Sequence, residues 1–428
     1  MSNHSGYRGK ALTFLKKNNL QVGDIVNIVT DSSYSGILMP RYEYSDDEHI
    51  VLKLKSGYNI GLEIDKIKKI KIESSVNVKN EKIPQPKTDP SLPKILLVST
   101  GGTIASKIDY RTGGVTPALT AAELNATVPE LAKIANIDTE VLFSEYSENL
   151  LPEHWKKIAE KIHSCVNSEY RGIIVAHGTD TMQYTAAALS FALAGIPIPV
   201  ALVGSQRSSD RPSSDAALNL ISAARFLVEC RTTGIYVVMH NTISDDDVAC
   251  HWGTRVRKNH TSKRNAFQTV GGSPAFIVKK DNIEKNDLFD PFKKEYTPKI
   301  NFDTRVALLK YYPGFDPKII DYIISTGYKA IIFEGTGLGH IGKIMYDYVA
   351  RAKKKCLFMG MTSQCVDGMV RMTVYESGRD LLNLGIVPLK NMIPETALVK
   401  AMWALGNSKN IKEMEELMKE NIVMEFSD

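Results

Sequence analysis

The sequence predicts an α/β protein in which two α/β domains with parallel-rich sheets follow a small β-barrel domain. Short strand-like runs separated by turns fill residues 1–72, and a proline-rich stretch follows them. From residue 94 onward, apolar strand-like runs alternate with amphipathic helix-like segments. Such alternation builds parallel sheets covered by helices. A chain of 428 residues is also too long for one ordinary core, so more than one domain is expected.

Residues 1–72 are expected to form the small barrel, of the SH3-like kind. A helical pattern at residues 10–17 comes first. Short strand-like runs with turns between them then lie at residues 25–29, 37–39, 49–54, 58–62 and 64–72. Several short strands in so short a segment are typical of small barrels. This domain carries no catalytic constellation, so we expect it to bind or position something.

Residues 73–93 are predicted to be a linker. Four prolines punctuate the segment among lysine, asparagine, serine and aspartate, namely Pro84, Pro86, Pro90 and Pro93. Its apolar content is too low to build a packed core.

The first α/β domain is expected at residues 94–285 and the second at residues 300–428, with a polar stretch between them. Buried strands of the first are predicted at residues 95–98, 172–176, 199–203 and 234–239, and its clearest helices at 152–163 and 216–228. The helix at 152–163 follows from apolar residues at helical spacing. An aspartate that reads as an N-cap, Asp215, precedes the helix at 216–228.

Composition places the chain among ordinary globular proteins, with 43% hydrophobic and 24% charged residues. No apolar run is long enough to span a bilayer and no signal peptide is evident, so we expect no membrane contact and a cytoplasmic location. The five cysteines are scattered without metal spacing, and the histidines form no ligand pair. No metal or cofactor is therefore expected in this chain. The net charge of +5 permits an acidic partner without requiring one.

Two predicted strands each end in glycine followed by threonine. Residues 95–98 lead to Gly101, Gly102 and Thr103, and residues 172–176 lead to Gly178, Thr179 and Asp180. Open α/β sheets bind ligands at the carboxyl ends of their strands, so the two hydroxyls are expected to converge on one pocket. Glycine-rich turns also open dinucleotide and phosphate sites, but the third glycine of the Rossmann fingerprint and the Walker lysine are both missing. A third glycine-rich turn, at residues 335–339, is weak evidence alone.

A hydroxyl is a poor nucleophile at neutral pH and needs a base or cation beside it. Together, the two threonine turns and the basic segment at residues 253–267 resemble the L-asparaginase/glutaminase family, whose nucleophile is a threonine. The resemblance implies that Thr103 attacks the side-chain amide. It further implies that Thr179, Asp180 and a lysine form a proton relay. Lys258 fits the lysine's place better than the alternative, Lys263.

The same resemblance assigns substrate-binding residues. Ser147 and Glu148, spaced before the tryptophan helix as in the family, would hold the α-carboxylate and α-amino groups of the substrate. Tyr110 is the candidate lid tyrosine, although the segment around it departs from ordinary asparaginases. Backbone N–H groups of the two threonine turns are expected to stabilise the oxyanion.

The asparaginase-like part begins near residue 94, behind the small barrel and linker, and carries an arginine- and serine-rich loop at residues 204–215. That arrangement resembles the family of D subunits of archaeal glutamyl-tRNA(Gln) amidotransferase. The resemblance implies hydrolysis of glutamine or asparagine to supply ammonia to a partner E subunit, which amidates Glu-tRNA(Gln) with ATP and Mg²⁺. ATP and Mg²⁺ would belong to the partner. A D-subunit homodimer flanked by two E subunits is expected.

Two other functions remain open from the sequence. A free-standing L-asparaginase would hydrolyse its substrate without a partner. A non-catalytic scaffold that binds RNA or protein through the barrel would leave the threonine and lysine motifs unexplained. The preference between glutamine and asparagine depends on one methylene of pocket depth, worth about 1–3 kcal/mol, and cannot be read from these residues.

Overall fold

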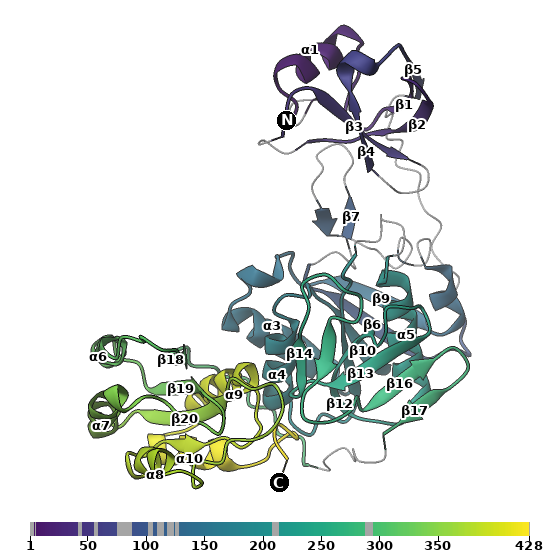
Figure 1. Ribbon diagram of the computed structural model, residues 1–428. Coiled ribbons are helices and arrows are strands. Elements are labelled where there is room, and N and C mark those ends of the chain that lie inside the picture. Colours follow the sequence, from purple (N-terminus) through teal and green to yellow (C-terminus); the bar gives the residue numbers. More distant parts are fainter. Residues whose placement is uncertain are drawn as a thin grey trace.

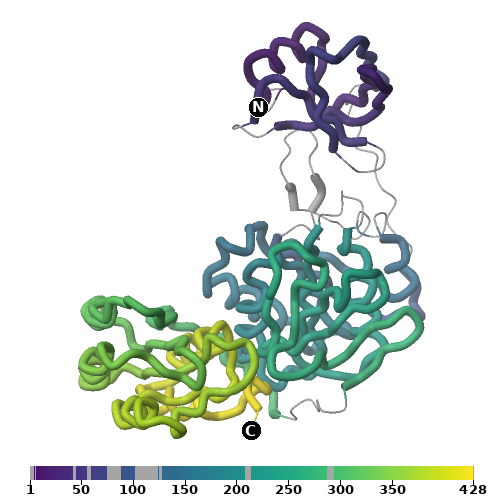
Figure 2. Tube along the Cα trace, in the orientation of Figure 1, coloured from purple at the N-terminus to yellow at the C-terminus, as the bar shows by residue number. Residues whose placement is uncertain are grey.

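We describe a computed structural model of the chain. The residues it describes are 4, 6–41, 45–54, 59–74, 88–101, 106–108, 115–117, 124, 128–207, 214–286 and 294–427. Figure 1 shows a small N-terminal domain above two larger α/β domains, and the tube in Figure 2 follows the chain through them in that order.

The N-terminal domain is a five-stranded antiparallel sheet with one helix. The predicted short strands are confirmed, whereas the pairings among the described residues do not close the sheet into the expected SH3-like barrel. The strand order is β4-β3-β2-β1-β5, so β4 and β5 lie at the two edges. Its elements are α1 (Gly9–Lys17), β1 (Ile25–Val29), β2 (Ser33–Leu38), β3 (His49–Leu54), β4 (Asn59–Glu63), η1 (Ile64–Lys66) and β5 (Lys69–Ser74). Apolar side chains of the helix and the inner sheet face form a separate core, which includes Leu15, Ile28 and Leu52.

The second domain is built on an eight-stranded sheet of order β17-β16-β13-β12-β11-β10-β6-β9. Strands β9, β6, β10, β11 and β12 run parallel, and β13, β16 and β17 continue the sheet antiparallel. The strands are β6 (Lys94–Ser99), β9 (Asn136–Val141), β10 (Tyr170–Ala176), β11 (Pro199–Val203), β12 (Gly234–His240), β13 (Asp247–Trp252), β16 (Phe276–Lys279) and β17 (Ile283–Lys285). Strand β11 is buried along its whole length and β10 from Gly172 to Ala176, because both faces of the sheet are covered.

Helices cover the two faces of this sheet. One core forms beneath α5 (Ala216–Glu229), and another beneath α3 (Pro152–Ser164) and α4 (Met182–Ala192). Two hairpins stand outside the sheet, formed by β7 (Ser106–Ile108) with β8 (Val115–Pro117) and by β14 (Val256–Lys258) with β15 (Phe267–Thr269). Short 3₁₀ turns are η2 (Pro129–Lys133) and η3 (Ser147–Asn149).

The third domain is a four-stranded parallel sheet in the order β18-β19-β20-β21. Its elements are β18 (Val306–Lys310), α6 (Lys318–Ser325), β19 (Ala330–Gly335), η4 (Lys343–Met345), α7 (Tyr346–Lys354), β20 (Phe358–Ser363), α8 (Glu376–Asn383), β21 (Val387–Pro388), α9 (Pro394–Gly406) and α10 (Ile411–Lys419). Helices α6, α7 and α8 cover one face, and α9 and α10 cover the other.

The two α/β domains share a hydrophobic core where α9 lies against α4. Phe191 of α4 stacks on Trp403 of α9 with ring centroids 5.7 Å apart, and Trp155 of α3 joins the same cluster. Figure 1 shows α9 beside α4 between the two sheets. The sequence prediction of parallel-rich α/β domains behind a small β domain is confirmed. None of the helices in the described part of the chain is long and apolar enough to cross a membrane.

Candidate active site

The turn after β10 is held by a buried histidine. His177 is fully buried, and its Nδ1 lies 2.6 Å from the carbonyl oxygen of Gly178. Because a carbonyl can only accept, Nδ1 carries the proton and donates to it. Nε2 then accepts from the hydroxyl of Thr185, 2.9 Å away. Burial lowers the pKa of His177 to about 4, so the ring is neutral at physiological pH and fixes the turn that leads to Thr179.

Lys258 reaches this turn from the hairpin outside the sheet. In that hairpin it pairs with Phe267, which is buried, and the next residue, Asn259, donates its N–H to Ala266 at 2.7 Å. The lysine Nζ donates to Thr179 Oγ1 at 2.8 Å and to Asp180 Oδ1 at 2.7 Å. The structure therefore brings together three of the residues that the sequence singled out.

Exposure differs between the two charged partners. The Lys258 side chain is 10% exposed, whereas that of Asp180 is 67% exposed. A partly desolvated amine hydrogen-bonded to a hydroxyl can exchange a proton with it, while the neighbouring carboxylate stabilises the ammonium form. This arrangement can move a proton between Thr179 and Lys258.

Ser147 packs directly against the Gly178 turn. A Cβ atom on Gly178 would lie 2.8 Å from the Cβ and 2.9 Å from the Oγ of Ser147, so only glycine fits there. Thr181 also donates its hydroxyl to the carbonyl of Ser147 at 2.6 Å. Ser147 is buried and Glu148, next to it in η3, is exposed. Both predicted substrate-binding residues thus lie on a segment fixed to the Thr179 turn.

The end of β6 lies beside the same turn. Thr100 donates both its N–H and its hydroxyl to the carbonyl of Ala176, the last residue of β10, at 3.0 and 2.9 Å. Gly101 has φ +111°, and a Cβ there would lie 2.3 Å from the carbonyl oxygen of Glu145. The chain therefore approaches residue 103 along this edge of the sheet. Thr103 and Tyr110 lie outside the described residues, so their placement stays a prediction.

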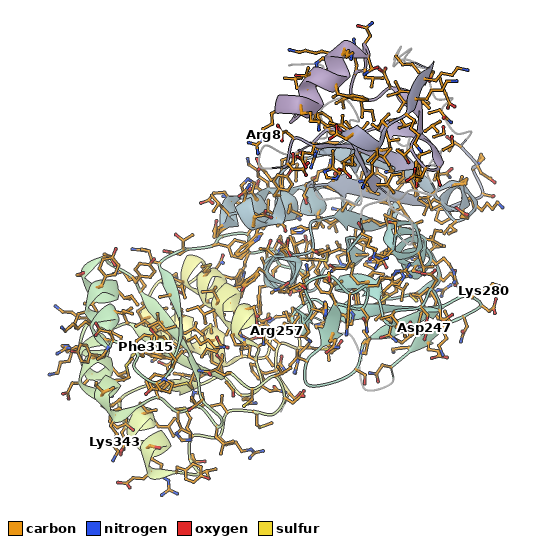
Figure 3. The ribbon with its side chains drawn as sticks, turned by 45° about the horizontal axis from the view of Figure 1, so that its top comes forward. Arg8, Asp247, Arg257, Lys280, Phe315 and Lys343 are labelled. Atoms are coloured by element: carbon orange, nitrogen blue, oxygen red, sulfur yellow. The ribbon has the colours of Figure 1, made fainter. Side chains whose placement is uncertain are left out.

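Two arginines of the basic segment at residues 253–267 are packed or paired rather than left in solvent. Arg255 is 4% exposed, and Arg257 Nε lies 3.0 Å from Glu395 Oε1 of α9. Figure 3 labels Arg257 at the boundary between the two α/β domains. Lys263, the alternative lysine, is exposed. Within the described ranges, no group of three or more His, Cys, Asp or Glu side chains could hold a metal ion.

His177 and Glu395 are two site residues that the sequence reasoning missed. His177 stands between the predicted strand at residues 172–176 and Gly178, and that position was the available signal. Glu395 is 7% exposed, and its neighbour Tyr184 has its pKa raised to about 12, chiefly by burial and also by the charge of Glu395. An acidic residue at the start of a helix gave no sequence signal for a contact with Arg257.

Three family profiles match the chain. "Asparaginase, N-terminal" matches residues 94–288, "Glutaminase/Asparaginase C-terminal domain" matches 305–418, and "GatD N-terminal domain" matches 20–72. The thermostable L-asparaginase of Thermococcus kodakarensis has a similar structure, with TM-score 0.70 and 32% identity over 78% of this chain and 99% of that one. A probable cytoplasmic L-asparaginase from Campylobacter jejuni gives TM-score 0.65 at 26% identity, over 76% of this chain and 99% of its own.

Relatives of full length are also found. The D subunit of the glutamyl-tRNA(Gln) amidotransferase of Metallosphaera sedula is 46% identical over 426 residues, covering 99% of this chain and 96% of that protein. Its counterpart in Pyrococcus abyssi is 44% identical over 425 residues, covering 97% of both. These relatives cover nearly the whole chain, whereas the two asparaginase structures cover 78% and 76% of it.

Proposed function

This chain belongs to the family of glutamyl-tRNA(Gln) amidotransferase D subunits, and we propose that it hydrolyses the side-chain amide of glutamine or asparagine to supply that reaction with ammonia. It is an amidohydrolase that works within an amidotransferase complex. The observation that carries the proposal is the position of Lys258 Nζ, within hydrogen-bonding distance of both Thr179 and Asp180 at the carboxyl edge of the sheet.

We assign the nucleophile to Thr103. Its hydroxyl oxygen forms a bond to the amide carbon and its proton is taken up by the relay of Thr179 and Lys258. When the carbon–nitrogen bond breaks, a proton returns to the nitrogen, which leaves as ammonia, and an ester of Thr103 remains. Water then attacks the ester and releases glutamate or aspartate. Asp180 stabilises the ammonium form of Lys258 during these transfers.

Ser147 and Glu148 are the proposed contacts to the substrate's α-carboxylate and α-amino groups. Their support is the close packing of Ser147 on Gly178, which fixes the segment one residue from Thr179. Tyr110 is proposed as the lid residue from its family resemblance alone.

We further propose that an E subunit takes up the ammonia and amidates Glu-tRNA(Gln), and that ATP and Mg²⁺ are bound by that partner. The expected assembly is a homodimer of this chain flanked by two E subunits. The support for a subunit rather than a free enzyme is the N-terminal β domain, which the "GatD N-terminal domain" profile matches, together with D-subunit relatives that cover 99% of the chain where the L-asparaginase structure covers 78%.

The test is to measure ammonia release from glutamine and from asparagine by the purified full-length chain. The assay is then repeated with the E subunit, Glu-tRNA(Gln), ATP and Mg²⁺. We expect weak hydrolysis by the chain alone and a sharp rise in the complete mixture, together with formation of Gln-tRNA(Gln). Vigorous hydrolysis at the same rate with and without the partner would instead identify a free-standing asparaginase. No hydrolysis in either mixture would refute the proposal that the chain is an amidohydrolase.

A further inference from the structure

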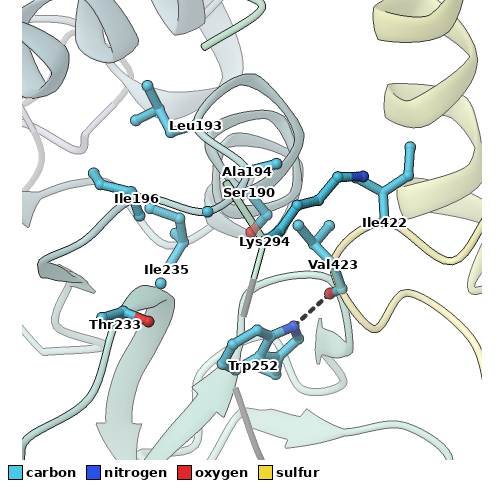
Figure 4. Close-up of a pocket in the computed structure, with 12 residues that line it drawn as sticks. Ser190, Leu193, Ala194, Ile196, Thr233, Ile235, Trp252, Lys294, Ile422 and Val423 are labelled. Carbon is cyan, nitrogen blue, oxygen red and sulfur yellow. Dashed lines mark hydrogen bonds between the residues drawn. The ribbon is translucent and has the colours of Figure 1, made fainter. Parts of the chain in front are cut away.

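The segment that leads from β13 into β14, the strand of Lys258, is hydrogen-bonded to residues near the C-terminus. Trp252 Nε1 and Thr254 Oγ1 both donate to the carbonyl oxygen of Val423, at 2.6 and 3.0 Å. Figure 4 shows the Trp252 bond at the seam between the two α/β domains. A carbonyl oxygen has two lone pairs, so one atom can hold both side chains. Residues 420–427, which we call the C-terminal clasp, therefore bind the segment just before Lys258.

Arg255 adds two further bonds to the clasp. Its Nε donates to the carbonyl oxygen of Met424 at 2.7 Å, and its Nη2 donates to Ser427 Oγ at 3.0 Å. Because Arg255 is 4% exposed, these bonds form away from water, and losing one would leave a buried polar group unsatisfied.

The first turn of α9 holds the same segment from a second direction. Thr396 donates its hydroxyl to the carbonyl of Thr254 at 2.9 Å. Glu395 pairs with Arg257 at 3.0 Å, one residue before Lys258. Consecutive parts of the segment leading to Lys258 are thus fixed to the C-terminal domain, and the lysine itself is fixed to the Thr179 turn.

The clasp is itself held by a buried ion pair. Lys400 of α9 and Glu425 are each 0% exposed, and Lys400 Nζ lies 2.5 Å from Glu425 Oε1. The Glu425 carboxylate also accepts the N–H groups of Ile422 and Val423, the latter at 2.7 Å. A buried ion pair whose other hydrogen-bonding positions are also filled favours one conformation of the clasp, because any conformation that breaks the pair leaves a charge buried without a partner.

The cavity at this seam is too small for a substrate. It has a volume of about 30 Å³ and is lined by Trp252, Val423, Ser190 and Lys294 among others (Figure 4). That is room for about two water molecules. Little empty space therefore lies beside Trp252 and Val423, so a shift of the clasp would be transmitted to the segment that it holds.

We propose that the C-terminal clasp and the first turn of α9 position the amine of Lys258, which makes Thr254 and Thr396 positioning residues for the amide hydrolysis. This inference rests on the proposed function, because it assigns a purpose to the placement of Lys258. In it, the C-terminal domain contributes to catalysis through the position of Lys258. A misplacement of about 1 Å in a reacting group can cost about a hundredfold in rate.

The first test compares three matched variants that each remove one buried hydroxyl. Thr254→Val and Thr396→Val each break a bond across the seam, whereas Thr362→Val breaks an equally buried bond to Phe333 inside the C-terminal sheet. We expect kcat for glutamine hydrolysis to fall about tenfold to a hundredfold in the first two, with KM changed less than about twofold, and no change in kcat for Thr362→Val. Thr254→Ser, which keeps the hydroxyl, should restore kcat. An equal loss in Thr362→Val, or unchanged kcat in the two seam variants, would overturn the proposal.

The second test is a double-mutant cycle between Thr254→Val and Lys258→Ala, assayed with the full-length chain in its complex. If Thr254 acts through the lysine, its substitution lowers kcat in the wild-type background and causes no further loss once the amine is gone. Additive losses would mean that Thr254 supports the fold in general and would refute positioning. The single Lys258→Ala variant separates the two proposals, because full activity there refutes the lysine relay, whatever the seam variants show.

Discussion

Both α/β domains place a glycine and a threonine at the carboxyl end of a central parallel strand. In the α/β domain of the eight-stranded sheet, His177, Gly178 and Thr179 follow β10. In the C-terminal α/β domain, Glu334 and Gly335 are the last residues of β19, and Thr336 follows them. In both, a lysine is paired with a carboxylate at that edge, Lys258 with Asp180 and Lys310 with Glu334. The two edges therefore carry similar groups.

The threonine hydroxyls are used differently. Thr179 Oγ1 accepts from Lys258, a residue 79 positions further along the chain. Thr336 Oγ1 instead donates to the carbonyl of His340, 3.1 Å away, and closes its own loop. Lys310 lies directly opposite Glu334 in the sheet register, so its pairing is an ordinary cross-strand contact. What distinguishes the first edge is a hairpin from outside the sheet that carries an amine to the hydroxyl.

The largest expected effect comes from removing each lysine. Lys258→Ala should lower amide hydrolysis by about 10³-fold, because a group that transfers protons in the transition state is lost. Lys310→Ala should leave the rate unchanged, since its side chain is 60% exposed and its amine pairs with Glu334 in the C-terminal domain. Ammonia release is the measurement, with circular dichroism to verify the fold of each variant. Comparable losses in the two variants would remove the distinction between the edges.

A smaller effect is expected at the threonines. Thr179→Val should lower kcat by about 10²-fold, because Lys258 loses the hydroxyl through which it would exchange a proton. Thr336→Val breaks only a loop bond at an exposed position and should cost about 1 kcal/mol of stability or less, with kcat unaffected. Steady-state kinetics and urea unfolding of both variants give these numbers. A normal kcat in Thr179→Val would show that the lysine does not act through that hydroxyl.

Local sequence patterns were sufficient to predict the strand β6 and the helices α3 and α5 of the domain that carries the Thr179 turn. The apolar run at residues 95–98 became β6, and the helices expected at 152–163 and 216–228 became α3 and α5 with ends within one residue. These segments can be predicted because the apolar periodicity and the helix-end signals that define them involve residues only a few positions apart. The Lys258 placement was expected from a family resemblance, because no local pattern encodes a contact across 79 residues.

Contacts across the domain seam could not be predicted in this way. Glu395 and Lys400 both stand in the helical segment of α9, where a charged residue usually faces solvent, and only the packing of α9 buries them. The clasp at residues 420–427 has no regular secondary structure and hence no periodic signal. A buried ion pair formed by residues 25 positions apart is a property of the tertiary fold.

The smallest expected effect is a change in stability with pH, and it comes from His177, the residue that precedes Gly178 and Thr179 at the first edge. The pKa of His177 is lowered from 6.5 to about 4 by burial, whereas the unfolded chain keeps the ordinary value. The unfolded state therefore binds the proton more readily, and acid favours unfolding. The stability that the neutral ring contributes is fully present above pH 6.5 and is lost progressively as the pH falls toward 4.

Between about pH 7.5 and about pH 5, this linkage should lower the free energy of unfolding by about 2 kcal/mol. Denaturant unfolding of the wild type and of His177→Gln at both pH values measures it, and the variant should lose that part of the pH dependence. His251 is a matched control, because burial lowers its pKa to about 3 and it stands on β13, away from the Gly178 turn. The His251→Gln variant should retain the part of the pH dependence of unfolding that comes from His177. If His177→Gln keeps the full pH dependence, the imidazole does not titrate as a buried neutral donor, and the bracing of the Thr179 turn must come from Thr181 and Ser147 instead.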